Sequence, residues 1–369
     1  MKIVIAGDFA PGYRIEKLIE QNNYQECFKQ VRDITLAYDY AIVNLECPIV
    51  KEMAKPIEKC GPNLKCSPKT AEVLKYAGFN CVTIANNHIY DYGEIGIKDT
   101  LDTLDKNSID HVGGGKNITE ASRILYKTIH NKTLAIINCC EHEFSIADEQ
   151  NGGANPINPI QQFYAIQDAR HNADFVLVIT HGGVENYQLP TPRMRELYRF
   201  YIDCGADTVI NHHQHCFSGY EYYNNKPIVY GLGNFCFDEP QRNSPWNYGY
   251  MVEIEFTDSP IITLIPYTQC NEQPIVEIIQ DKRKFEENIS QLNNIILNCA
   301  QLKLHYDDLL KKGARFYQLS AEPYHTRLTN GLYVHQLLPS FIRRKKWRLL
   351  DYIMCESHLE RLAYAIRNL

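Results

Sequence analysis

Polar residues that can bind metal ions follow five short apolar runs of the chain, each at the point where a run ends. The runs are rich in β-branched residues and alternate with stretches of helical periodicity, which is typical of a βαβ sheet. Because ligands bind beyond the carboxyl ends of strands in such sheets, we expect the five clusters to share one edge. The clusters are Gly7-Asp8, Asn44-Leu45-Glu46, Asn86–Gly93, His181–Glu185 and Asn211–His215.

The residue types in these clusters favour a site for divalent cations. Carboxylates neutralise and bridge metal ions, imidazole suits Zn, Fe or Mn, and an amide oxygen completes a coordination shell. Taken singly, an Asp after a strand, such as Asp8, is more often a helix cap than a ligand, and a pair such as Asn86-Asn87 is more often a turn. His213 and His215 are more specific, because alternation in an extended segment places both imidazoles on one side.

The predicted strands and helices divide the chain into two parts. Further strands at Gly219–Tyr223, Lys226–Tyr230, Tyr250–Phe256 and Ile261–Pro266 complete a domain over residues 1–274. Helical periodicity with few glycines then predicts a mostly helical appendage over residues 275–369. Its basic run, Arg343-Arg344-Lys345-Lys346 with Arg348, is either a solvated helix face or a peripheral contact for an anionic membrane surface or a partner.

Composition excludes some classes of function. The formal charge of −6 argues against a general nucleic-acid binder, which would be basic. Four apolar residues before Gly7-Asp8 are too few for a signal-peptide core. The 13 cysteines are odd in number, irregularly spaced and without a CxxC pair, which is typical of a reducing compartment. We therefore expect a cytoplasmic protein, with membrane contact limited to its periphery.

The clusters in this order resemble the CapA / poly-γ-glutamate capsule-synthesis family of the calcineurin-like metallophosphoesterase superfamily. The resemblance covers about residues 3–240 and includes the segment Lys226–Phe235. It implies an α/β fold, an αββα sandwich, followed by the helical appendage. It also implies one or two divalent ions (Mn, Fe or Zn) held by six ligands, which are Asp8, Glu46, Asn87, His181, His213 and His215.

The resemblance also implies roles within this set. Asp8 and His215 would bind the first metal, Glu46 would bridge, and the other three would bind the second. His88 would donate a proton or stabilise charge in the transition state, and Asp91 would orient His88.

One position departs from the superfamily pattern. The usual Asp-x-His of the first strand is Asp8-Phe9-Ala10 here, so the first metal lacks a histidine ligand. The candidates to replace it, or to contact substrate, are Glu185, Glu141, His142 and Glu143.

The implied function is a metal-dependent hydrolase of the metallophosphoesterase type in capsule or exopolymer biosynthesis, with metal-bound hydroxide as nucleophile. Its substrate would be a phosphorylated or acylated small molecule or a capsule-polymer precursor. The partner of the basic C-terminal run would then be a membrane or the capsule machinery. Two alternatives stay open. One is an acyl or γ-glutamyl hydrolase or transferase acting on a capsule polymer. The other is a non-catalytic, metal-stabilised accessory protein of capsule assembly.

Overall fold

The computed structural model describes residues 1–51, 54–239, 245–324 and 326–367. They form two compact units: an N-terminal unit, Met1–Leu302, and a C-terminal unit, Lys303–Leu369. Among the described residues, no helix combines the length and the apolar character needed to cross a membrane.

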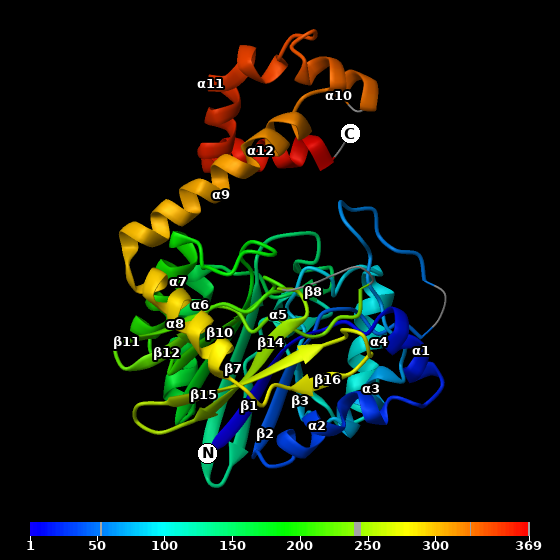
Figure 1. Cartoon of the computed structure of the whole chain (residues 1–369), viewed down its shortest axis with the longest axis vertical. Coiled ribbons are helices and arrows are strands. Elements are labelled where there is room, and N and C mark those ends of the chain that lie inside the picture. The colour runs from blue at the N-terminus through cyan, green and yellow to red at the C-terminus, as the bar shows by residue number, and fades with distance from the viewer. Residues whose placement is uncertain (52–53, 240–244, 325, 368–369) are drawn as a thin grey trace. The chain divides into compact units, whose positions relative to one another are not determined.

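The N-terminal unit alternates strands and helices, as the periodicity predicts (Figure 1). Its first half contains β1 (Lys2–Phe9), α1 (Tyr13–Glu20), α2 (Gln25–Thr35), β2 (Tyr40–Leu45), α3 (Thr70–Tyr76), β3 (Cys81–Thr83), α4 (Gly93–Lys106), β4 (Asp110–Val112), β5 (Gly114–Gly115), α5 (Ile118–Ala121), β6 (Leu125–Ile129), β7 (Lys132–Cys140) and β8 (Gly153–Ala154). Its second half contains α6 (Pro159–Asn172), β9 (Phe175–His181), α7 (Pro192–Asp203), β10 (Thr208–His212), β11 (Tyr220–Tyr223), β12 (Lys226–Val229), β13 (Asn234–Cys236), β14 (Tyr248–Glu255), β15 (Ile261–Gln269), β16 (Val276–Ile278) and α8 (Arg283–Leu297).

Two large sheets form the centre of this unit. The first has the order β16-β15-β14-β1-β2-β3-β4, with β13 also paired to β1, and the second has the order β11-β12-β10-β9-β7-β6. β1 to β4 are mutually parallel, and so are β7, β9, β10 and β12. Parallel pairing brings the carboxyl ends of these strands to common edges, where the predicted polar clusters follow.

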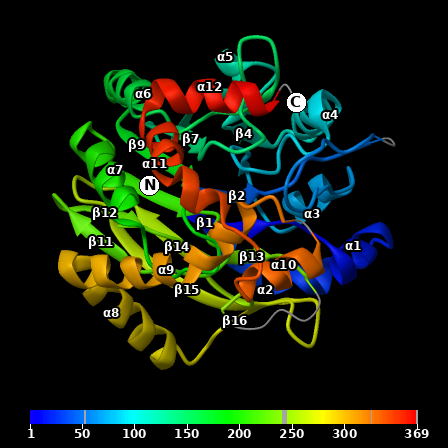
Figure 2. The same cartoon turned by 90° about the horizontal axis from the view of Figure 1, so that it is seen from above.

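Three hydrophobic cores place the sheets face to face with helices outside. Ile5 and Ile42 from the first sheet meet Leu177 and Ile210 from the second in the core between the sheets. A second core joins the other face of the first sheet to α1–α4, and a third joins the second sheet to α6 and α7. α1–α4 and α6–α7 accordingly lie on opposite sides of the paired sheets (Figures 1 and 2). The predicted αββα sandwich is confirmed.

The N-terminal unit extends beyond residue 274, where the sequence places the boundary. β16 adds a strand to the first sheet, and α8 then packs on the sandwich. Phe285 and Ile289 of α8 enter the core between the sheets, and Ile296 and Leu302 enter the core beside α7. The apolar stripe of α8 is thus buried by the sandwich, which moves the boundary to Leu302.

The C-terminal unit is helical, as its periodicity predicts. It contains most of α9 (Cys299–Ser320), followed by α10 (Arg327–Val334), α11 (Phe341–Met354) and α12 (Glu356–Arg367). α11 packs against α12 within the unit.

Candidate metal centre

The first strand carries Asp8 into the interior of the sandwich. Asp8 is paired in parallel register with Asn44 of β2 and with Asn234 of β13, so neighbouring strands hold it from both sides. Gly7 permits this approach, because a Cβ at position 7 would lie 1.8 Å from the carbonyl oxygen of Gly233. A side chain at position 7 would therefore displace the strand that carries Asp8.

The Asp8 carboxylate is buried among groups that stabilise its negative charge. Its Oδ1 accepts a hydrogen bond of 2.8 Å from Asn44 Nδ2, and its Oδ2 accepts one of 3.3 Å from the backbone N–H of His213. His212 Nδ1 lies 3.3 Å from Oδ1. Burial alone raises the pKa of Asp8, but the hydrogen bond and charge of His212, with His181 and His215, lower it below its usual range.

The second sheet contributes imidazoles to the same place. His181 ends β9, and His213 follows β10; His213 Nδ1 lies 3.1 Å from His181 Nε2. Burial, and then the neighbouring His213, lowers the pKa of His181 well below its usual value. Burial, and then His215, lowers the pKa of His213 to about 3. Both rings are therefore neutral near pH 7, which is the form that binds a metal ion.

The backbone after β10 differs from the predicted extended segment. His213 and His215 have φ angles of 91° and 54°, in the left-handed region that side chains other than glycine seldom adopt. The two imidazoles share the site because the chain turns sharply here, not because strand alternation aligns them. Such local strain is typical of functional loops.

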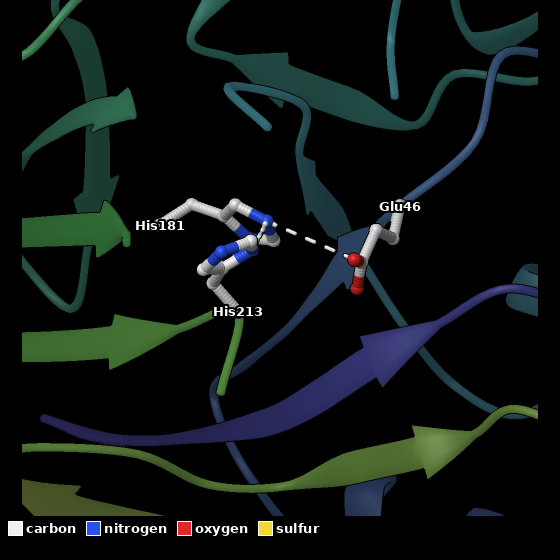
Figure 3. A group of neighbouring side chains, drawn as sticks. All are labelled: Glu46, His181 and His213. Carbon is white, nitrogen blue, oxygen red and sulfur yellow. Dashed lines mark hydrogen bonds and ion pairs between the residues drawn. The ribbon is translucent and has the colours of Figure 1, made fainter. Parts of the chain in front are cut away.

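Glu46 faces these histidines from the first sheet (Figure 3). Its Oε1 lies 3.7 Å from His181 Nε2 and 3.5 Å from His215 Nε2. The Glu46 side chain is fully buried, and neither carboxylate oxygen has a hydrogen-bond partner among the described residues. Burial, and then the Asp8 carboxylate, raises the pKa of Glu46 well above its usual value. A buried carboxylate without donors is costly unless a cation neutralises it.

The donor atoms fit divalent cations. Within three overlapping sets, the ligand atoms all lie within 4.8 Å of one another: Glu46 with His181 and His213, Asp8 with Glu46 and His215, and Glu185 with His213 and His215. Glu46 belongs to two of the sets, as expected of a bridging ligand. Asn87 Oδ1 lies 3.1 Å from His181 Nε2, so an amide oxygen completes the first set. The structure thus brings together all six residues for which the sequence predicts metal binding.

His88 and Asp91 form a buried pair next to Asn87. His88 Nδ1 donates to Asp91 Oδ2 over 2.7 Å, which fixes the orientation of the ring. A third member, Lys59, is not predicted from the sequence; its side chain is 3% exposed and forms an ion pair with Asp91. Lys59 Nζ also lies 3.2 Å from His88 Nδ1. No motif marks Lys59, because it belongs to a loop without periodicity.

The four acidic and histidine candidates for the missing ligand separate into two groups. Glu185 lies with His213 and His215, and Glu143 Oε1 lies 3.9 Å from His213 Nε2. Glu141 instead accepts a hydrogen bond from the backbone N–H of Gly183, and the exposed His142 donates to the carbonyl oxygen of Ile157. Glu185 and Glu143 therefore reach the histidine side of the site, whereas Glu141 and His142 point to other partners.

Comparisons with known proteins agree on one family. Residues 2–239 match the family model described as "Bacterial capsule synthesis protein PGA_cap". The "Capsule biosynthesis protein CapA" of Bacillus anthracis is 27% identical over 327 residues, 85% of this chain and 80% of that protein. The "PGA biosynthesis protein CapA" of Bacillus subtilis is 34% identical over 236 residues, 63% of this chain and 62% of that protein.

Among solved structures, a hypothetical protein from Thermus thermophilus is 17% identical and aligns with a TM-score of 0.44. The alignment covers 72% of this chain and 99% of that protein.

Proposed function

Because the chain belongs to the bacterial capsule synthesis protein family PGA_cap, we propose that it is a metal-dependent hydrolase of the metallophosphoesterase type that acts in capsule or exopolymer biosynthesis. The environment of the Glu46 side chain is the main support for this function. Its fully buried carboxylate has no hydrogen-bond donor among the described residues and lies within 3.7 Å of imidazole nitrogens from the opposite sheet.

The residues that would hold the cations are Asp8, Glu46, Asn87, His181, His213 and His215, with Glu185 as a further ligand in place of the missing histidine. Divalent cations bound here would supply Lewis acidity and would lower the pKa of a bound water to roughly 7. Asn44 keeps the Asp8 carboxylate in place through its hydrogen bond to Oδ1. His212 Nδ1 lies 3.3 Å from the same oxygen.

His88 is the proposed proton donor to the leaving oxygen. Its Nδ1 is committed to Asp91, which leaves Nε2 for the substrate side. Asp91 also accepts from the backbone N–H of Leu64 over 2.6 Å and pairs with Lys59, so the loop around residues 57–64 is fastened to the same carboxylate. Asp91 and Lys59 thus act as positioning residues for His88.

The biological role is proposed from the names of the relatives. The proteins from Bacillus anthracis and Bacillus subtilis are named for capsule and PGA biosynthesis. The proposed substrate is a phosphorylated or acylated precursor of such a polymer.

A second candidate function rests on Ala10. This residue stands where a typical metallophosphoesterase has a histidine ligand, and a site with weaker metal binding suits a non-catalytic accessory role in polymer assembly. Attack on an acyl or γ-glutamyl bond is the other alternative.

The test measures turnover of bis-p-nitrophenyl phosphate and p-nitrophenyl phosphate by the full chain with Mn²⁺, before and after EDTA. We expect turnover that EDTA abolishes and Mn²⁺ restores. Protein with bound metal but no turnover of either ester would overturn phosphoester hydrolysis and favour the second candidate. A γ-glutamyl p-nitroanilide then distinguishes acyl chemistry from an accessory role.

A further inference from the structure

The C-terminal unit leaves its apolar side chains uncovered. Among its described residues no hydrophobic side chain is buried, and Glu322 is the one residue that is. Trp347 and Met354 are each 78% exposed, and Phe316 and Tyr317 are about as exposed. Exposed apolar surface on this scale marks a site of interaction with a partner or a membrane.

The same unit is strongly positive. Residues 303–369 contain 12 Lys and Arg against 6 Asp and Glu, a formal charge of +6, within a chain whose net charge is −6. Five of the six residues from Arg343 to Arg348 are basic, and the sixth is Trp347. All six lie in α11.

Hydrogen bonds stabilise the N-terminus of α11, so the basic run Arg343–Arg348 lies on a formed helix. The Ser340 side chain accepts from the backbone N–H of Arg343 over 3.0 Å. The buried Glu322 accepts from the backbone N–H of Phe341 over 2.9 Å and from the Ser340 hydroxyl. A carboxylate at a helix N-terminus is stabilised by the free backbone N–H groups there.

One stripe of α11 combines apolar and basic side chains. Leu349 and Leu350 are half-buried on the helix that packs against α12. Trp347 and Met354, seven residues apart, fall on one line of the exposed surface, and Arg343 lies one turn before Trp347. Lys346 Nζ lies 4.9 Å from the centre of the Trp347 ring.

We propose that α11 docks the protein on a lipid bilayer with anionic headgroups. The basic side chains pair with the headgroups, and Trp347 and Met354 enter the interface between headgroups and acyl chains. Lysine is depleted at the centre of protein–protein interfaces, whereas Lys and Arg beside Trp are typical of helices that lie in a membrane surface. The charge and the exposed indole therefore favour a bilayer over a second protein.

The first experiment is sedimentation of the full chain with vesicles of phosphatidylcholine, alone or with phosphatidylglycerol. Binding is expected only with phosphatidylglycerol and is expected to weaken as salt is raised. In the variant R343Q/R344Q/K345Q/K346Q the affinity is expected to fall by about a hundredfold or more, at roughly fivefold for each basic side chain. All four side chains are exposed, so the variant should fold, and circular dichroism checks this.

A matched control removes four exposed lysines of the N-terminal unit, in the variant K17Q/K29Q/K98Q/K132Q. It loses the same charge and is expected to bind vesicles like the unaltered chain. Equal losses of vesicle affinity in both variants would show that binding depends on net charge alone and would overturn a specific role for α11.

Tryptophan fluorescence tests insertion independently of sedimentation. The chain has two tryptophans, of which Trp246 is buried and Trp347 is exposed. Anionic vesicles are expected to shift the emission to shorter wavelength and to reduce quenching by acrylamide, and Trp347→Phe is expected to abolish both changes. Absence of vesicle binding would overturn the proposal. Self-association that the four-residue variant abolishes would then identify a second copy as the occupant of α11.

Discussion

Glu46 Oε1 lies 3.7 Å from His181 Nε2, although Glu46 follows a strand of the first sheet and His181 ends a strand of the second (Figure 3). The two side chains meet across the boundary between the sheets. Burial keeps His181 neutral, which is the form that binds metal, but it disfavours the ionised form of Glu46. A cation bound here would therefore stabilise the Glu46 carboxylate.

Replacing Glu46 by Gln is expected to reduce the metal retained after desalting by about tenfold or more, because even outer partners of metal ligands contribute roughly 10–100-fold to affinity. Elemental analysis of protein purified without chelators measures this. The melting temperature in EDTA should not fall, since the variant removes a buried carboxylate that lacks hydrogen-bond donors among the described residues. Glu141→Gln is the control, because Glu141 accepts from Gly183 and belongs to none of the ligand sets. Full metal retention in Glu46→Gln would contradict the bridging role.

Replacing His88 by Ala is expected to lower turnover of p-nitrophenyl esters by about two to four orders of magnitude, the usual contribution of a general acid. Metal content should stay unchanged, because His88 belongs to none of the ligand sets. His142→Ala provides the comparison, since this exposed histidine donates to a backbone carbonyl away from the ligand sets. Turnover at the unaltered rate in His88→Ala would rule out the proposed proton transfer.

Lys59→Met is expected to lower turnover by about 10–100-fold, as removal of an orienting partner does. It should also lower the free energy of unfolding by about 3 kcal/mol, because it leaves the buried Asp91 without its cation. Lys59→Arg keeps the charge and should recover much of the loss in kcat. Steady-state kinetics and urea unfolding measure the two effects. If Lys59→Met unfolds more easily but keeps its kcat, Lys59 supports only the fold.

A buried ion cluster on the second sheet predicts acid sensitivity. Burial alone raises the pKa of Glu221, but hydrogen bonds from Arg199, Tyr230 and Arg195 outweigh it and lower the pKa below the ordinary value. A carboxyl group with a lower pKa in the folded state stabilises the fold above its unfolded pKa, and this contribution is lost as pH falls through the folded value.

Glu221→Gln should therefore be less stable than the unaltered chain at pH 7 by about 3 kcal/mol, because Arg195 loses a buried partner. This difference in the free energy of unfolding should become smaller as pH falls below about 4.5, the ordinary pKa of a glutamate. Urea unfolding at a series of pH values from neutral to acidic follows this difference. A gap that stays constant over this range would contradict the lowered pKa.

The periodicity of the sequence predicts the parts of the fold that depend on local patterns. Strands such as β2 and β9 are buried on both faces and appear as short apolar runs, so Asp8, Glu46 and His181 can be located at strand ends from the sequence. Lys59 could not be predicted, because it lies in a loop and only its tertiary contact with Asp91 sets the direction of its side chain. The turn at His213 was missed for a similar reason, since its positive φ depends on contacts made across the two sheets.

The boundary after Leu302 depended on tertiary structure in the same way. The apolar stripe of α8 is compatible with a separate helical domain or with packing on a sheet, and its pattern alone does not distinguish them. The helix is assigned to the sandwich by the burial of Phe285 and Ile289 in the core between the sheets.

The division of the candidate ligands between the two sheets has a consequence for the biosynthesis of the protein itself. Asp8 and Glu46 emerge early from the ribosome, whereas His213 and His215 emerge more than 160 residues later. A nascent chain that has formed only its first strands holds carboxylates without imidazoles and cannot retain Zn or Mn tightly. Metal binding would therefore stabilise only those chains in which the second sheet has also formed.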